Sequence, residues 1–213
     1  MLSKELQSIL AETKGEGEIS SFLAHNPNLI RWAVCRTGGH STYVLKEFPF
    51  GSKYKADFVV PMSYSGAWEV NIIELEPPDD IVITKEGLPS NRLNKAISQI
   101  NDWKEYIARN PLEFRMDLSN WCIKKDLLGF FNDKKTPTNN TGDLLNSPET
   151  AIFYNYYIFI GNRENVDNEK RRRVNQLRNE IEIFTYGRFL DIAKNFDKAE
   201  MNPNETIFFT RLR

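Results

Sequence analysis

Asp57, Glu74 and Glu76 lie towards the two ends of one largely apolar stretch of the sequence, residues 55–78. Asp57 opens the segment DFVV, and Glu74 and Glu76 close the segment NIIELE. Because burying an unpaired charge costs several kcal/mol, carboxylates in such surroundings need a partner or a function. Their hard oxygen atoms favour Mg²⁺ or Mn²⁺ over softer metals. If the three side chains meet, the chemistry that they suit is metal-dependent hydrolysis of a phosphodiester.

A β-hairpin is predicted to bring these side chains together. Tyr54–Met62 and Trp68–Glu76 have the composition of two strands. Ser65-Gly66 is the best turn dipeptide between them, because glycine adopts the backbone conformations that tight turns need. A turn at this position places Tyr64 opposite Ala67.

This register places Asp57 opposite Glu74 and Lys55 opposite Glu76, with directly opposed Cβ atoms about 4.5–5.5 Å apart. Glu74 and Glu76 share a face because strand residues two apart point to the same side. Carboxylates this close repel one another unless a cation lies between them. The alternative is an exposed hairpin end with ordinary solvated charges, and the spacing alone leaves both interpretations open.

The remaining sequence predicts a mixed α/β fold, with a central sheet flanked by helices. Helices are expected at 2–12, 16–26, 90–109, 164–180 and 187–196, and strands at 42–50, 54–62, 68–76, 151–162 and 181–186. The helix at 90–109 carries an apolar stripe at helical spacing. The aromatic run at 151–162 is typical of a strand buried on both faces. We expect one domain over residues 1–213, with a surface insertion around 112–149.

Composition restricts the classes of function. The net charge of −1 gives no global basic field, so binding of nucleic acid requires a local basic patch. The helix with Lys170, Arg171, Arg172, Arg173 and Arg178 is one candidate, although its charges also have acidic neighbours to pair with. Two cysteines are too few for a disulfide framework, and the two histidines lack zinc-ligand spacing. No apolar run is long enough to span a membrane, so we expect a soluble, cytoplasmic protein.

Five stretches carry a resemblance to a known family: EISSFLAHNPNLI, KADFVV, NIIELEPP, LNKAISQINDWKEYI and IEIFTYGRFLDIA. In this order and spacing, from about Glu18 to Ala193, the chain resembles the Shedu family of bacterial antiphage defence nucleases. That family is similar to the PD-(D/E)xK superfamily, so the resemblance implies a restriction-endonuclease-like αβββαβ core. It also implies DNA as the substrate, Mg²⁺ or Mn²⁺ as the cofactor, and assembly into a homo-oligomer.

The resemblance assigns roles to individual residues. Asp57 and Glu74 would be direct metal ligands, aided by the backbone carbonyl of Leu75. Glu18 would hold the metal directly or through water.

At the third position of the motif the family normally has a lysine that orients the attacking water, whereas this chain has Glu76. Lys55 and Lys95 are the two candidates for a replacement cation, and the alternative for Lys95 is an ordinary solvated helix residue. Gln99 shares a helix face with Lys95 and would contribute to the site.

Two functions are expected. The first is a metal-dependent DNA endonuclease that hydrolyses phosphodiester bonds in antiphage defence. The second is a nuclease-fold module, impaired in catalysis by Glu76, that binds DNA or a partner without cutting.

Overall fold

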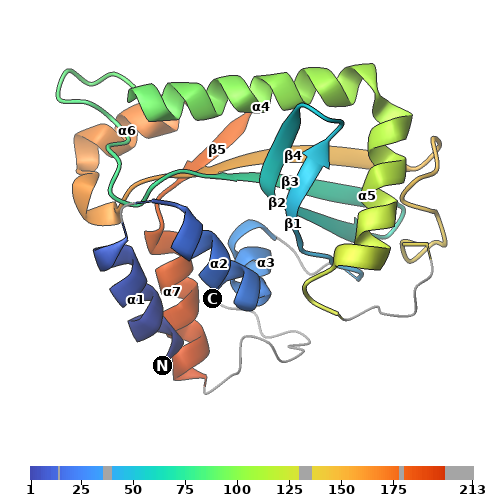
Figure 1. The fold of residues 1–213 in the computed structure, drawn as a ribbon, viewed down its shortest axis with the longest axis horizontal. Coiled ribbons are helices and arrows are strands. Elements are labelled where there is room, and N and C mark those ends of the chain that lie inside the picture. Colours follow the sequence, from blue (N-terminus) through green and yellow to red (C-terminus); the bar gives the residue numbers. More distant parts are fainter. Residues whose placement is uncertain (14, 36–39, 130–135, 178–179, 200–213) are drawn as a thin grey trace.

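The hairpin with the acidic residues belongs to a five-stranded sheet at the centre of the computed structural model, which describes residues 1–13, 15–35, 40–129, 136–177 and 180–199 (Figure 1). The strands follow one another across the sheet in chain order: β1 (Leu45–Phe50), β2 (Tyr54–Tyr64), β3 (Ala67–Leu75), β4 (Ala151–Phe159) and β5 (Ile181–Phe184). The pairs β1–β2 and β2–β3 are antiparallel, whereas β3–β4 and β4–β5 are parallel. The sheet is therefore mixed, as the sequence predicts.

Helices cover both faces of this sheet (Figure 1). One layer contains α1 (Leu2–Glu12), α2 (Gly17–His25), α3 (Pro27–Val34) and α7 (Gly187–Lys198). The other contains α4 (Asn91–Arg109), α5 (Pro111–Lys125) and α6 (Asn168–Leu177), with the short 3₁₀ helix η1 (Arg163–Asn165) before α6. Each layer encloses its own apolar core, so the expected α/β architecture with flanking helices is confirmed.

The predicted hairpin register is confirmed from the turn to Phe58 and Ile73, whereas the predicted pairs of Asp57 with Glu74 and of Lys55 with Glu76 do not form. Tyr64 pairs with Ala67 across a turn at Ser65-Gly66, and the ladder between β2 and β3 continues in the same register to Phe58 and Ile73. Gly66 has a φ of +82°, a value that residues with a Cβ rarely adopt. The turn therefore decides which hairpin residues face α4.

Strand β4 is buried on both faces over its second half, as predicted. Tyr156 and Ile158 contribute to the core beneath α4, and Tyr157 and Phe159 contribute to the core beneath α7. The first half differs, because the side chain of Phe153 is 63% exposed. The buried half of β4 therefore pairs with the last residues of β3 and holds that end of the sheet in the core.

Helix α4 crosses one face of the sheet and begins beside the end of β3 (Figure 1). Its first turn is capped by Ser90, whose hydroxyl accepts a hydrogen bond from the Leu93 amide at 3.1 Å. Its predicted apolar stripe is buried: Leu93, Ala96, Ile100, Trp103 and Ile107. Beside this apolar stripe, the polar residue Gln99 of α4 faces Glu74 of β3.

The segment 112–149, expected to be a surface insertion, begins with a helix that packs on the sheet. Residues 111–125 form α5, because its apolar side packs on the sheet: Phe114 and Trp121 make edge contacts with the Phe48 ring. Only the irregular residues after α5 remain as an excursion, and these include the buried Leu145.

Two further expectations concern helices. Within the described ranges, none of the helices has the length and apolarity needed to cross a membrane. The charged helix is present as α6, although its predicted member Arg178 lies outside the described residues.

Candidate active site

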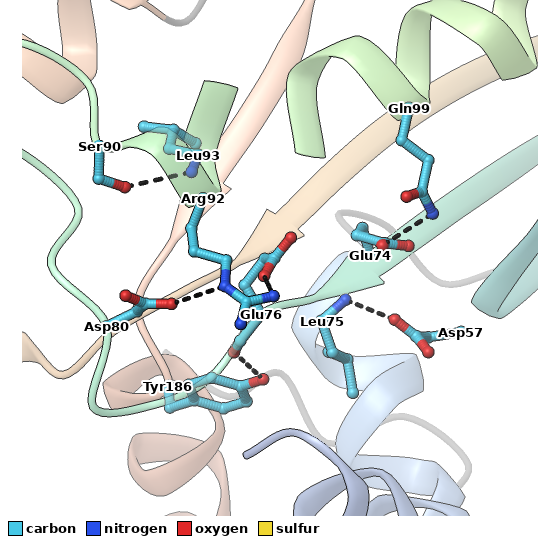
Figure 2. A network of polar contacts seen from close by, with 10 residues as sticks. All are labelled: Asp57, Glu74, Leu75, Glu76, Asp80, Ser90, Arg92, Leu93, Gln99 and Tyr186. Carbon is cyan, nitrogen blue, oxygen red and sulfur yellow. Dashed lines mark hydrogen bonds and ion pairs between the residues drawn. The ribbon is translucent and has the colours of Figure 1, made fainter. Parts of the chain in front are cut away.

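The site forms where β2 and β3 separate. Beyond Phe58 and Ile73 the two strands no longer pair, and the Leu75 amide donates instead to Asp57 Oδ2 at 2.7 Å (Figure 2). On its other side β3 continues to pair with β4, where Leu75 aligns with Phe159. Asp57 thus replaces a main-chain partner at the point where the hairpin opens, and its carboxylate is fixed there.

Glu74 faces α4 and is held by Gln99. The Gln99 Nε2 donates to Glu74 Oε1 at 2.8 Å (Figure 2). The side chain of Glu74 is nearly buried, with 8% of the residue exposed. Sequence reasoning placed Gln99 at this site, and the structure brings the two side chains together.

Asp57 and Glu74 act electrostatically as a pair. Burial is the largest cause that raises the pKa of Glu74, to about 9, and the negative charges of Asp57 and Glu76 raise it further. Burial also raises the pKa of Asp57, to about 6, against the stabilising hydrogen bond from Leu75. Among the described residues, no lysine or arginine forms an ion pair with either carboxylate. The charge of Lys55 only partly offsets this rise at Asp57, so two acids lie together without an ion-pair partner among the described residues.

Glu76 follows β3 and has a different set of partners. Its carboxylate Oε2 lies 3.7 Å from Arg92 Nη1, and the same guanidinium contacts Asp80 Oδ2 through Nε at 3.3 Å (Figure 2). The Tyr186 hydroxyl donates to the Glu76 carbonyl oxygen at 2.8 Å. Burial raises the pKa of Glu76 to about 7, although Arg92 opposes this shift. Arg92 and Tyr186 therefore fix both the side chain and the main chain of Glu76.

Among the described residues, neither of the two predicted replacement cations forms an ion pair with Glu76. Lys55 does not face Glu76, because β3 has ended there; its ammonium pairs with Glu47 Oε1 at 3.2 Å. Lys95 is exposed on α4 and lies in a groove with Gln99. The cation that reaches Glu76 is Arg92, one turn earlier on α4.

Helix α2 presents a different acid from the one expected. Glu18 is exposed and accepts a hydrogen bond from the Thr13 hydroxyl at 2.5 Å. Glu16, immediately before α2, is the acid whose charge raises the pKa of Asp57, Glu74 and Glu76. Sequence reasoning missed Glu16 because it counted this residue only as the beginning of a helix.

The donor set fits a divalent cation held by two carboxylates. In the part of the chain that the structure describes, no group of three or more His, Cys, Asp and Glu side chains is arranged to hold a metal. Mg²⁺ needs fewer, since one or two carboxylates usually hold it while waters and substrate phosphates supply the remaining ligands. Asp57 and Glu74 each have one oxygen engaged by the protein, and the other oxygens accept no hydrogen bond from the described residues. The metal role of the Leu75 carbonyl stays a prediction.

The comparison with protein families identifies the chain. A family model described as "Shedu protein SduA, C-terminal" matches residues 13–190. This range contains the acidic hairpin, α4 and the beginning of α7. The chain belongs to the Shedu family. A search of curated proteins found no match to this Shedu chain.

Proposed function

We propose that this Shedu protein is a metal-dependent DNA endonuclease of antiphage defence, with a restriction-endonuclease-like core of the PD-(D/E)xK type. The observation that carries the proposal is the pair Asp57 and Glu74, one half-buried and one buried carboxylate at the open end of a hairpin, neither of which forms an ion pair with a lysine or arginine among the described residues. Such a pair is costly unless a cation binds it. Shedu membership supports the role in antiphage defence.

In this proposal Asp57 and Glu74 hold Mg²⁺ or Mn²⁺, with the Leu75 carbonyl as a further ligand. A divalent ion held by these two carboxylates would supply Lewis-acid chemistry for activation of water and stabilisation of the leaving oxygen. Gln99 keeps the Glu74 carboxylate oriented, and the Leu75 amide does the same for Asp57.

The reaction is hydrolysis of a phosphodiester. A water oxygen forms a bond to phosphorus, one P–O ester bond breaks, and a phosphate monoester and a hydroxyl are released. Glu76 orients the water by accepting one of its hydrogen bonds, and Arg92 holds the Glu76 carboxylate in place. Glu76 thus occupies the position of the usual motif lysine, but it orients the water with a carboxylate instead of an ammonium group.

The proposal also covers the cellular location of the protein, its oligomeric state and the role of the acids near α2. The protein acts in the cytoplasm on DNA, and it assembles into a homo-oligomer, because cutting both strands of a duplex is served by two symmetry-related sites. The family resemblance gives Glu18 the role of holding the metal directly or through water, and the effect of Glu16 on the pKa of all three site acids makes Glu16 a second candidate for that role.

The test is cleavage of supercoiled plasmid and linear duplex DNA by the purified protein in Mg²⁺, in Mn²⁺ and in EDTA. We expect nicking or cutting in at least one metal and none in EDTA. Absence of cutting in both metals would contradict the proposal.

The alternative is a module that binds DNA or a partner without cutting. Glu76 in place of lysine and the lack of a third clustered acid in the described residues favour it. Tight DNA binding without cleavage in either metal would support this alternative over the enzyme.

Gln99→Ala is expected to lower the cleavage rate about 10- to 100-fold without unfolding the protein, the range for residues that orient a metal ligand. The rate falls because Glu74 Oε1 loses its hydrogen-bond donor. Initial rates at increasing Mn²⁺ concentration measure the effect, and excess metal should recover part of the activity.

Asn101→Ala is the matched control, since Asn101 is an exposed amide on the same helix. It should retain the wild-type rate. A wild-type cleavage rate in Gln99→Ala would show that Gln99 has no role in the reaction.

A further inference from the structure

A groove beside the acidic pair is lined by exposed lysines from two elements. Lys53 precedes β2, Lys55 lies at its beginning, and Lys95 lies on α4. The α4 wall of the groove also contains Ser98, Gln99 and Asp102. The lysines are far apart in the sequence, and the packing of α4 against the sheet brings them to one hollow.

Gln99 connects this groove with the acidic pair. Its side chain lines the groove and at the same time donates to Glu74 Oε1 at 2.8 Å. Lys95 and Gln99 are one helical turn apart and share a face of α4. The groove and the acidic pair therefore adjoin at Gln99.

The groove carries an excess of positive charge. Its lining has three ammonium groups and one carboxylate, that of Asp102, and the charge of Glu105 also acts on Lys53 from outside the lining. The ion pair of Lys55 with Glu47 joins two side chains that are each more than half exposed, so it contributes little and is readily exchanged. The Lys53 ammonium lies 4.6 Å from the centroid of the Tyr54 ring, which holds the side chain at the rim.

This charge arrangement suits a polyanion rather than a small ligand. Two carboxylates without a cation repel an approaching phosphodiester, and neighbouring ammonium groups offset that repulsion. Lysines act as point charges for phosphates and supply affinity that does not depend on sequence.

We propose that the groove binds the phosphodiester backbone of DNA on the α4 side of the phosphate that is cut. This inference rests on the proposed function, because the groove matters only if DNA is the substrate. It adds the residues that hold the strand.

The test is binding of a fluorescent DNA duplex in EDTA, which prevents cleavage, at salt concentrations from about 50 to about 200 mM. The variant replaces Lys53, Lys55 and Lys95 together with alanine. The slope of log affinity against log salt is negative, and each lost phosphate contact makes it less steep by about 0.9. The slope of the triple variant should therefore be less steep than that of the wild type by about 2 to 3. All three lysines are exposed, so the variant should fold.

The matched control replaces Lys4, Lys194 and Lys198 with alanine, since these exposed lysines belong to α1 and α7 on the opposite face of the sheet. It changes the net charge equally and should keep the wild-type slope. Equal slopes in the two triple variants, or no measurable binding of DNA by the wild type, would contradict the proposal that the groove binds DNA. Loss of slope in a protein that cuts in no metal would keep the groove as a binding site and reject the nuclease.

Discussion

We expect Asp57→Asn to abolish the proposed metal-dependent cleavage, with a loss of at least about a hundredfold, because residues that only orient a ligand already account for about 10- to 100-fold. The substitution removes the charge that would bind the ion. It leaves an amide oxygen that can still accept the hydrogen bond from the Leu75 amide. The hairpin end should therefore keep its shape, and the loss reports on the charge.

The measurement is the nicking rate of supercoiled plasmid in Mg²⁺ and in Mn²⁺, with the melting temperature as a check on folding. Glu105→Gln is the control, because Glu105 is an exposed acid of α4 that pairs with Arg109. It loses the same charge away from the site and should cut at the wild-type rate. Comparable cutting by Asp57→Asn and Glu105→Gln would mean that Asp57 has no part in the reaction.

Metal-free wild-type protein loses stability as the pH rises through the neutral range, and Glu74→Gln removes most of that loss. Folded Glu74 keeps its proton to a pKa of about 9, whereas the unfolded chain releases it near the ordinary value of 4.5. Between these two values the folded state holds more protons than the unfolded state. The free energy of unfolding therefore falls with increasing pH. The raised pKa values of Asp57 and Glu76 act in the same direction.

Thermal unfolding in EDTA at several values between about pH 5 and about pH 9 measures this effect. The melting temperature of Glu74→Gln relative to that of the wild type should increase as the pH rises. The reason is that the amide of the variant is neutral at every pH and can still accept the hydrogen bond from Gln99. Mn²⁺ should restabilise the wild type at the alkaline end and leave the variant nearly unchanged, because a ligand stabilises only the state that binds it. Parallel pH profiles of wild type and variant would show that Glu74 is ionised and paired in the folded protein.

The sequence predicts the hairpin well because its determinants are local. The glycine in Ser65-Gly66 fixes the turn, the turn fixes the register, and the register places Asp57 and Glu74 next to each other where the paired part of the hairpin ends. The apolar stripe of α4 is equally local, and it turns Gln99 toward the sheet.

The two unpredicted helices share one cause. Asn26 and Asn110 each precede a proline, which predicts the end of a helix, and a helix does end at each. In each case the asparagine side chain bonds back to the preceding helix, and the proline then begins a new one, α3 or α5. Proline suits the first position of a helix because its missing amide hydrogen has no partner there. A proline therefore marks the boundary of a helix but does not determine whether a loop or another helix comes next.

Contacts between distant elements could not be predicted. Glu16 and Glu18 are two residues apart and point in different directions, and only the packing of α2 on the sheet decides which one affects the site acids. The pairing of Arg92 with Glu76 depends on where β3 ends and α4 begins, across an intervening loop.

A Mn²⁺-soaked crystal of the wild-type protein, measured for anomalous scattering, tests most directly whether Asp57 and Glu74 share a divalent cation. We expect an anomalous peak within coordinating distance of one oxygen from each carboxylate, and its absence from crystals of Asp57→Asn. A fully soaked wild-type crystal with no peak there, or with a peak bound by neither acid, would contradict the proposed metal site.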